Sequence, residues 1–171
     1  MRIRPVQASD LEAVFAIYNR EIREGVATLD TAEVTPEQQR AWFAARTNAR
    51  HPGIVALDDD GRVLGFANLG AWSPKCGYAR AAEVSVYVRH DAQGRGVGRA
   101  LLAELIRLGR DAGLGVLLAR MESTREGSRR LHESLGFVRI GTLHRVGEKF
   151  GRVLDVDIYE CHLDRYERPG A

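Results

Sequence analysis

The sequence predicts a single α/β (α+β) domain in which a mixed, mostly antiparallel central sheet has helices on both faces. Its 171 residues are 44% hydrophobic, which is enough for one packed core without disulfides. The expected elements follow the order β, α, α, β, β, β, α, β, α, β, β. Long antiparallel runs are combined with one strand–loop–helix–strand crossover, which adds a parallel pair. We expect residues 1–171 to form this domain, with a flexible tail over the last few residues.

Two amphipathic helices are expected after a short strand at residues 2–6, which Pro5 limits to a sheet edge. A capping box precedes apolar residues at helical spacing in the first helix, and the same start signal opens the second. The signals are Ser9 with Glu12 and a stop at Gly25 for the first helix, and Thr35, Pro36 and Gln38 for the second.

The other elements follow from alternating or helical apolar patterns. They are a hairpin of 54–57 and 63–69, the strand EVSVYV at 83–88, a helix at 99–113, a strand at 115–121, a helix at 126–135, and a closing hairpin of 137–144 and 153–163 around 147–151. A glycine-rich loop therefore lies between the strongest strand and the strongest helix.

Composition excludes several classes of protein. The 25 Lys and Arg against 23 Asp and Glu give a net charge of +2, too balanced for a nucleic-acid binder. The longest apolar run, at 113–119, is far shorter than the ~20 residues of a membrane span, and the N-terminus lacks an apolar signal core. Two cysteines, Cys76 and Cys161, fit neither a disulfide framework nor a structural zinc site. We therefore expect a soluble, cytoplasmic protein that needs no metal.

Arginines gather in the second half of the chain. Between Arg89 and Arg110 the five arginines face only Asp91 and Glu104. Such an excess suits a small ligand that carries phosphates, and it equally suits a solvated helix face.

The loop at 93–100, QGRGVGRA, has three glycines at alternate positions before a helix. Glycines let backbone N–H groups approach a ligand closely at the positive end of a helix dipole. The Walker A pattern GxxxxGK[ST] is absent from the sequence. A dinucleotide fingerprint would need its third glycine at position 99, where Arg99 stands. The loop is therefore predicted to cradle a pyrophosphate, the alternative being a glycine-rich turn without a ligand.

This loop resembles the acyl-CoA-binding motif of the GNAT N-acetyltransferase superfamily, [QR]xxGx[GA], through Gln93, Gly96 and Gly98. The segments YNREI, AWF, EVSVYV, LHESLGF and VGEKFGRVLD are similar to the bacterial branch of phosphinothricin and methionine sulfoximine N-acetyltransferases. The similarity covers most of residues 1–165.

The resemblance implies that acetyl-CoA is the cosubstrate and lies in a gap between the strands at 83–88 and 115–121. The residues that it assigns to the cofactor are Val86, Tyr87 and Val88 for the pantetheine arm, Gly94, Arg95, Gly96, Val97, Gly98 and Arg99 for the pyrophosphate, and Arg125, where the branch has an asparagine. It also implies a homodimer, with the hairpin tip at 149–151 as a candidate dimer contact or pocket-lining element.

Transfer to an amine needs a base, because alkyl amines are protonated at pH 7. Glu83 matches the glutamate of the branch and is predicted to be this base or to position a water, the alternative being a structural carboxylate. His132 is a candidate acid for the departing thiolate, the alternative being a packing histidine.

Three departures from the branch concern specificity. Ser73 replaces an arginine, Val84 a histidine and Arg125 an asparagine. Lys75 is a candidate to restore the charge, or is simply solvated. The expected substrate contacts are Ser73, Pro74, Lys75, Glu83, Val84 and Ser85.

The sequence thus predicts an acetyl-CoA-dependent N-acetyltransferase acting by direct transfer on a small amino-acid-like amine. Acetylation of a peptide N-terminus or a polyamine is one alternative. A catalytically silent acyl-CoA-binding sensor is another.

Overall fold

Seven strands form one sheet in the computed structural model, which describes residues 1–164. The expected C-terminal tail falls largely outside these residues. The strands are β1 (Arg2–Pro5), β2 (Gly53–Leu57), β3 (Val63–Ala71), β4 (Ala81–Val88), β5 (Val116–Glu122), β6 (Val138–Lys149) and β7 (Arg152–His162). Their order across the sheet is β1-β2-β3-β4-β5-β7-β6, and only β4 and β5 are parallel.

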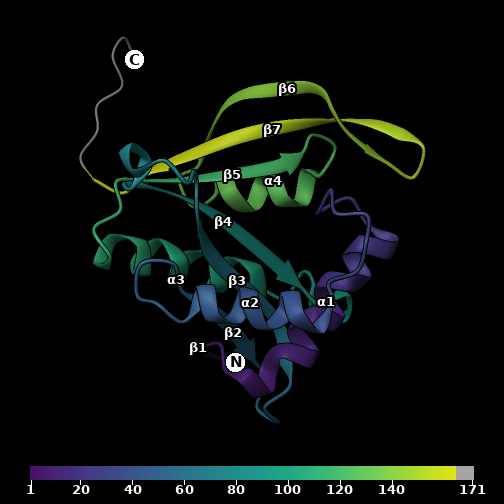
Figure 1. Ribbon diagram of the computed structural model, residues 1–171, viewed down its shortest axis with the longest axis vertical. Coiled ribbons are helices and arrows are strands. Elements are labelled where there is room, and N and C mark those ends of the chain that lie inside the picture. Colours follow the sequence, from purple (N-terminus) through teal and green to yellow (C-terminus); the bar gives the residue numbers. More distant parts are fainter. Residues whose placement is uncertain (165–171) are drawn as a thin grey trace.

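Within the described part of the chain, four α-helices cover the two faces of the sheet (Figure 1). They are α1 (Leu11–Glu24), α2 (Pro36–Arg46), α3 (Val97–Asp111) and α4 (Glu126–Glu133). The predicted order of elements and the mixed, mostly antiparallel sheet are confirmed. None of the helices within residues 1–164 is long and apolar enough to cross a membrane.

The core has two layers because side chains alternate between the faces of the sheet. On β2, Ile54 and Ala56 pack with α3, whereas Val55 and Leu57 pack with α1. The α1 and α2 layer also holds a group of aromatic rings, in which Phe66 stacks on Tyr87 at 5.2 Å. Tyr87 is one of the predicted cofactor residues, and its ring therefore belongs to this layer.

One predicted helix start is correct and the other is wrong. Thr35 and Gln38 cap α2 reciprocally, as expected. Before α1, however, the capping box joins Gln7 and Asp10 around a short 3₁₀ turn. The Asp10 carboxylate accepts the Gln7 N–H at 2.8 Å and pairs with Arg4 at 2.6 and 2.8 Å. These contacts fix the chain before α1, and Ser9 stays exposed.

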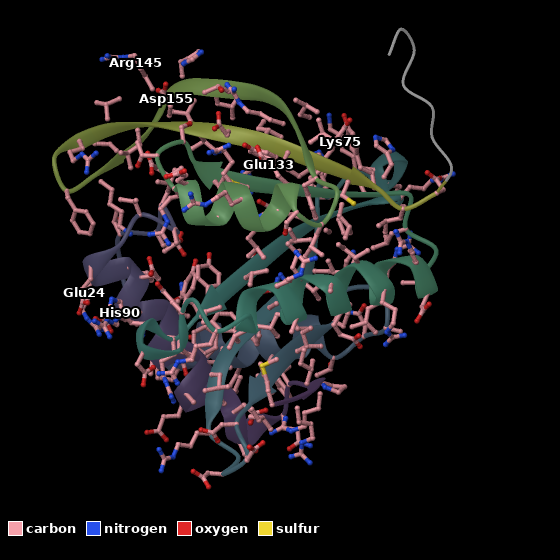
Figure 2. The ribbon with its side chains drawn as sticks, turned by 180° about the vertical axis from the view of Figure 1, so that it is seen from behind. Glu24, Lys75, His90, Glu133, Arg145 and Asp155 are labelled. Carbon is pink, nitrogen blue, oxygen red and sulfur yellow. The ribbon has the colours of Figure 1, made fainter. Side chains whose placement is uncertain are left out.

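The closing hairpin extends further than its sequence pattern indicates. The predicted strand ends at 144, but β6 continues to Lys149 after a register shift between Leu143 and Gly147. Arg145 has a positive φ of 58° at this shift, and its N–H donates to Asp155 at 2.7 Å. Figure 2 shows Arg145 and Asp155 together on this arm. At its tip, the buried Lys149 ammonium donates to the carbonyls of Glu21 and Thr28, which joins the hairpin to the end of α1.

Candidate active site

The strands β4 and β5 separate, as expected. They pair only from Ala81 to Glu83 with Val116 to Leu118, although both continue beyond these residues. The N–H of Arg89, just after β4, donates to the carbonyl of Leu64 in β3 at 2.9 Å. Because backbone groups alternate in direction along a strand, those of Val86 and Val88 face the gap. Tyr87 was also expected to bind the pantetheine arm through its backbone, but its backbone groups face β3 instead.

The glycine loop lies at the wide end of this gap. Gly94 and Gly96 have φ angles of +74° and +81°, the left-handed region that favours glycine, and Gly96 is the N-cap of α3. The first backbone hydrogen bond of the helix runs from Ala100 to Gly96, so the N–H groups of Val97 and Gly98 have no helical acceptor. A Cβ on Gly98 would lie 3.2 Å from the Leu131 side chain. The loop therefore presents backbone donors at a helix N-terminus, the arrangement that binds anions.

The arginine excess divides into two groups. On α3, Arg107 pairs with Glu104 and Asp111, which is the solvated, salt-bridged helix face. Arg99 donates to Ser134 at 2.6 Å. Arg95 forms no hydrogen bond or close salt bridge within residues 1–164, although, after the hydrogen bond from Arg89, its charge helps to lower the pKa of Asp91. Arg95 therefore stands beside the glycine loop with its guanidinium available to a ligand.

A cavity of about 760 Å³ lies between α1 and the connection from β4 to α3. Three residues from separate segments meet in it, namely Val88 at the end of β4, Gln93 of the loop and Arg125, the N-cap of α4. Figure 2 shows two other lining residues, Glu24 and His90, next to each other, and Lys75 far from both. The cavity and the Ser73–Lys75 loop thus lie toward opposite ends of β4.

Glu83 occupies the last paired position before the gap, opposite Leu118. Its carboxylate forms a two-fold ion pair with Arg120 of β5, from Nε to Oε1 and from Nη2 to Oε2, both at 2.7 Å. The Arg120 guanidinium also lies 5.6 Å from the ring centre of Trp72, and its hydrogen bonds to Glu83 raise the pKa of Arg120. The Glu83 and Arg120 side chains are 22% and 53% exposed, so the pair contributes only ~0–1 kcal/mol to folding.

Comparison with known proteins assigns this architecture. A model of the acetyltransferase (GNAT) family matches residues 11–137. The chain belongs to this family. L-amino acid N-acyltransferase MnaT of Escherichia coli (strain K12) is 40% identical over 171 residues, covering 100% of this chain and 99% of its own. L-methionine sulfoximine/L-methionine sulfone acetyltransferase of Pseudomonas aeruginosa is 40% identical over 162 residues, covering 95% and 94%. The structure of a GNAT superfamily phosphinothricin acetyltransferase from Sinorhizobium meliloti in complex with AcCoA aligns with a TM-score of 0.91 at 31% identity, covering 94% of this chain and 87% of that one.

In this GNAT chain, His132 has the surroundings of a packing residue. Its side chain is buried, its ring meets Phe137 edge-to-face at 5.0 Å, and Nδ1 donates to the Ser128 carbonyl at 2.8 Å. Burial lowers the pKa of His132, so the neutral ring is favoured. With the proton on Nδ1, Nε2 carries a lone pair and no proton. The predicted role of His132 as an acid stays a prediction and requires the disfavoured protonated ring.

The expected substrate residues fall into two groups. Ser73, Pro74 and Lys75 follow β3, where the Ser73 hydroxyl accepts the Lys75 N–H at 3.3 Å and Lys75 is exposed. Ser85 shares the α1 and α2 face with Glu83. The inclusion of Val84 is corrected here, because its side chain is 5% exposed and packs in the opposite core layer with α3.

Arg120 is not among the site residues predicted from the sequence. Its only signal in the sequence was its position near the end of the strand expected at 115–121. That strand was expected to lie beside the strand that begins with Glu83. The register that brings the two side chains together is visible only in the structure. Within residues 1–164, no three His, Cys, Asp or Glu side chains are close enough to hold a metal ion.

Proposed function

We propose that this GNAT protein transfers an acetyl group from acetyl-CoA to the amine of a small amino-acid-like acceptor. The observation that carries the proposal is the gap between β4 and β5, with the Glu83 carboxylate at its narrow end and the glycine loop at its wide end. Five residue steps of about 3.3 Å separate Glu83 from Val88, roughly 17 Å of strand edge that does not pair with β5. At its end the Val88 carbonyl accepts from Gln93 Nε2 at 3.4 Å. The printed names of the relatives from Escherichia coli and Pseudomonas aeruginosa support an amino-acid-like acceptor.

The residues present fit acetyl-CoA. The backbone groups of Val86 and Val88 face the gap and match the amides of a pantetheine arm. The free N–H groups of Val97 and Gly98, with Arg95, match a pyrophosphate. Arg99 lies in the first turn of α3, next to these N–H groups, and Arg125 lines the cavity at the wide end of the gap.

In the proposed reaction acetyl-CoA supplies an acetyl thioester, whose C–S bond breaks as the new C–N bond forms. The acceptor must first lose a proton, because an alkyl amine comparable to lysine, with a pKa of about 10.4, is charged at pH 7. Glu83 accepts this proton, directly or through one water. His132 in its protonated form is the candidate that gives a proton to the departing thiolate. Ser73, Pro74, Lys75 and Ser85 are proposed to border the acceptor.

Release of free thiol from acetyl-CoA tests this function. We expect turnover with L-methionine sulfone and phosphinothricin, and much slower turnover with spermidine, because Arg120 beside Glu83 leaves no net negative charge to attract a polyamine. Dipeptides are tested beside them. Faster turnover of the polyamine or the dipeptides would favour the alternative acceptors. Tight binding of acetyl-CoA without turnover of any amine would favour the silent sensor.

We further propose a homodimer that forms through β6. This strand is one of the two edges of the sheet, and apolar side chains are exposed along it and at the hairpin tip. They are Val138, Ile140, Leu143, Val146, Phe150 and Val153. Light scattering should give twice the chain mass of 19.0 kDa, and a particle of one chain mass at micromolar concentration would refute the dimer. A cytoplasmic location belongs to the same proposal, and the two free cysteines support it.

A further inference from the structure

The ion pair of Glu83 and Arg120 covers the group that the proposed reaction needs. Both carboxylate oxygens of Glu83 accept from the guanidinium at 2.7 Å. Each oxygen keeps a second lone pair, but the guanidinium balances the charge of Glu83 and occupies one side of both oxygens, so an incoming ammonium group gains more if Arg120 moves away. The two side chains lie at the point where β4 and β5 cease to pair, where the acceptor is proposed to meet the thioester.

An α-amino acid is the charge complement of this pair. Its ammonium matches the Glu83 carboxylate, and its carboxylate matches the Arg120 guanidinium. We propose, on the basis of the proposed function, that Arg120 is a specificity-determining residue that binds the anionic group of the acceptor and thereby uncovers Glu83 for the amine.

The surroundings of Arg120 suit such an exchange of partners. Its side chain is 53% exposed, so it is accessible to a small molecule. The Trp72 ring, 5.6 Å from the guanidinium carbon, holds the arginine at the site after it leaves Glu83. Trp72 immediately precedes Ser73, which has no charge to offer an anionic acceptor, and Lys75 is exposed. Arg120 therefore contacts both Glu83 and Trp72, the residue that immediately precedes this loop.

The exchange of ion-pair partners also favours acceptors that carry an anionic group over those that do not. An acceptor with a carboxylate replaces one ion pair by two. An acceptor with an amine alone separates Glu83 from Arg120 and leaves the guanidinium without a partner. The proposal thus predicts a discrimination that depends on Arg120 and disappears with it.

The test compares L-methionine sulfone with its carboxamide, which keeps the amine and lacks the carboxylate. Steady-state kinetics at saturating acetyl-CoA are measured for the wild type, Arg120→Met and Arg120→Lys. We expect Arg120→Met to raise KM for the carboxylate acceptor about 10- to 100-fold, with kcat changed less, while kcat/KM for the carboxamide changes less than about threefold. Arg120→Lys should recover part of the lost affinity because it keeps the charge.

Arg107→Met is the matched control. Arg107 is 57% exposed and binds Glu104 in the same two-fold manner, at 2.7 and 3.0 Å, but it lies on the outer face of α3. It should leave both acceptors unaffected. If Arg120→Met weakens both acceptors equally, or neither, the ion pair is structural and the proposal is wrong.

Calorimetric binding of L-methionine sulfone to CoA-saturated protein separates this proposal from the proposed function. Affinity that falls in Arg120→Met supports the role of Arg120 even if no acetyl group is transferred. Absence of both binding and turnover with the wild type would overturn both proposals. Turnover with unchanged binding in Arg120→Met would overturn only the role of Arg120.

Discussion

The two sides of β4 behave differently. Toward β3, pairing is continuous from Ala82 to Val88. Toward β5, it stops at Glu83. The reason lies in the other neighbours, since β5 pairs with β7 over its whole length from Val116 to Glu122 and follows that strand, whereas β4 follows β3. The sheet is therefore two half-sheets joined by three residue pairs, and an extended ligand can take the place of the missing ladder.

Glu83→Gln changes the residue at the junction of the two half-sheets and should have the largest effect. Loss of general-base catalysis predicts a fall in kcat of roughly 10²–10⁴-fold, with the affinity for acetyl-CoA little changed because its proposed contacts lie further along β4. Glu104→Gln, which alters an ion pair on α3, is the control. A pH–rate profile like that of the wild type would exclude Glu83 as the base.

Gly96→Val acts at the wide end of the gap. A β-branched residue is strained at φ = +81°, so the loop must rearrange and withdraw its backbone donors. Loss of two hydrogen bonds to a charged phosphate predicts about 100-fold weaker binding of acetyl-CoA in calorimetry.

Gly113→Val is its control, because Gly113 has a similar φ of +70° with open space around it at the other end of α3. Gly113→Val should destabilise the fold to a similar degree without lowering the affinity for acetyl-CoA. Equal affinities in the two variants would remove the phosphate assignment of the loop.

Val86→Pro and Tyr87→Pro compare the two sides of β4 directly. The N–H of Val86 faces the gap, so its removal should leave the protein folded. It should lower the affinity for acetyl-CoA about 2- to 10-fold, which corresponds to the loss of one hydrogen bond. The N–H of Tyr87 faces β3, so its removal should destabilise the protein by about 3 kcal/mol or more. Thermal unfolding and calorimetry measure both effects. The opposite pattern would reverse the assignment of the two edges.

His132→Leu, in α4, has the smallest expected effect, which is on the pH dependence of stability. Burial lowers the pKa of His132 in the folded protein, so the unfolded chain binds more protons below about pH 6.5. Stability should therefore fall as the pH decreases from about 6.5, and less steeply in the variant. His51, whose pKa is also lowered by burial, is unchanged in both proteins. Equal decreases in Tm between pH 7.5 and 5.0 would contradict the assignment of a buried neutral ring.

Local signals in the sequence account for most of the fold. The alternation of EVSVYV, the stop at Gly25 and the cap at Thr35 each depend on residues close together in the chain, and each is confirmed. The errors arise where a contact with a residue distant in sequence determines where an element begins or ends. Asp10 depends on Arg4 from β1, and the length of β6 depends on a register shift opposite Asp155.

The site divides in the same way. The glycine loop is a local motif, and its left-handed conformations follow from Gly94 and Gly96. The partner of Glu83 is not local, since Arg120 is 37 residues away and reaches it only through the parallel register of β4 and β5. Alternation along β4 also could not show which backbone groups face the gap, because that depends on how β3 pairs with it.

Residue-resolved amide hydrogen exchange, with and without acetyl-CoA, tests most directly the claim that the cofactor replaces the missing ladder between β4 and β5. The N–H groups of Val86 and Val88 should exchange fast in the free protein and become protected on binding. That of Tyr87, already bonded toward β3, should change little. Unchanged exchange at Val86 and Val88 in the acetyl-CoA complex would contradict the claim.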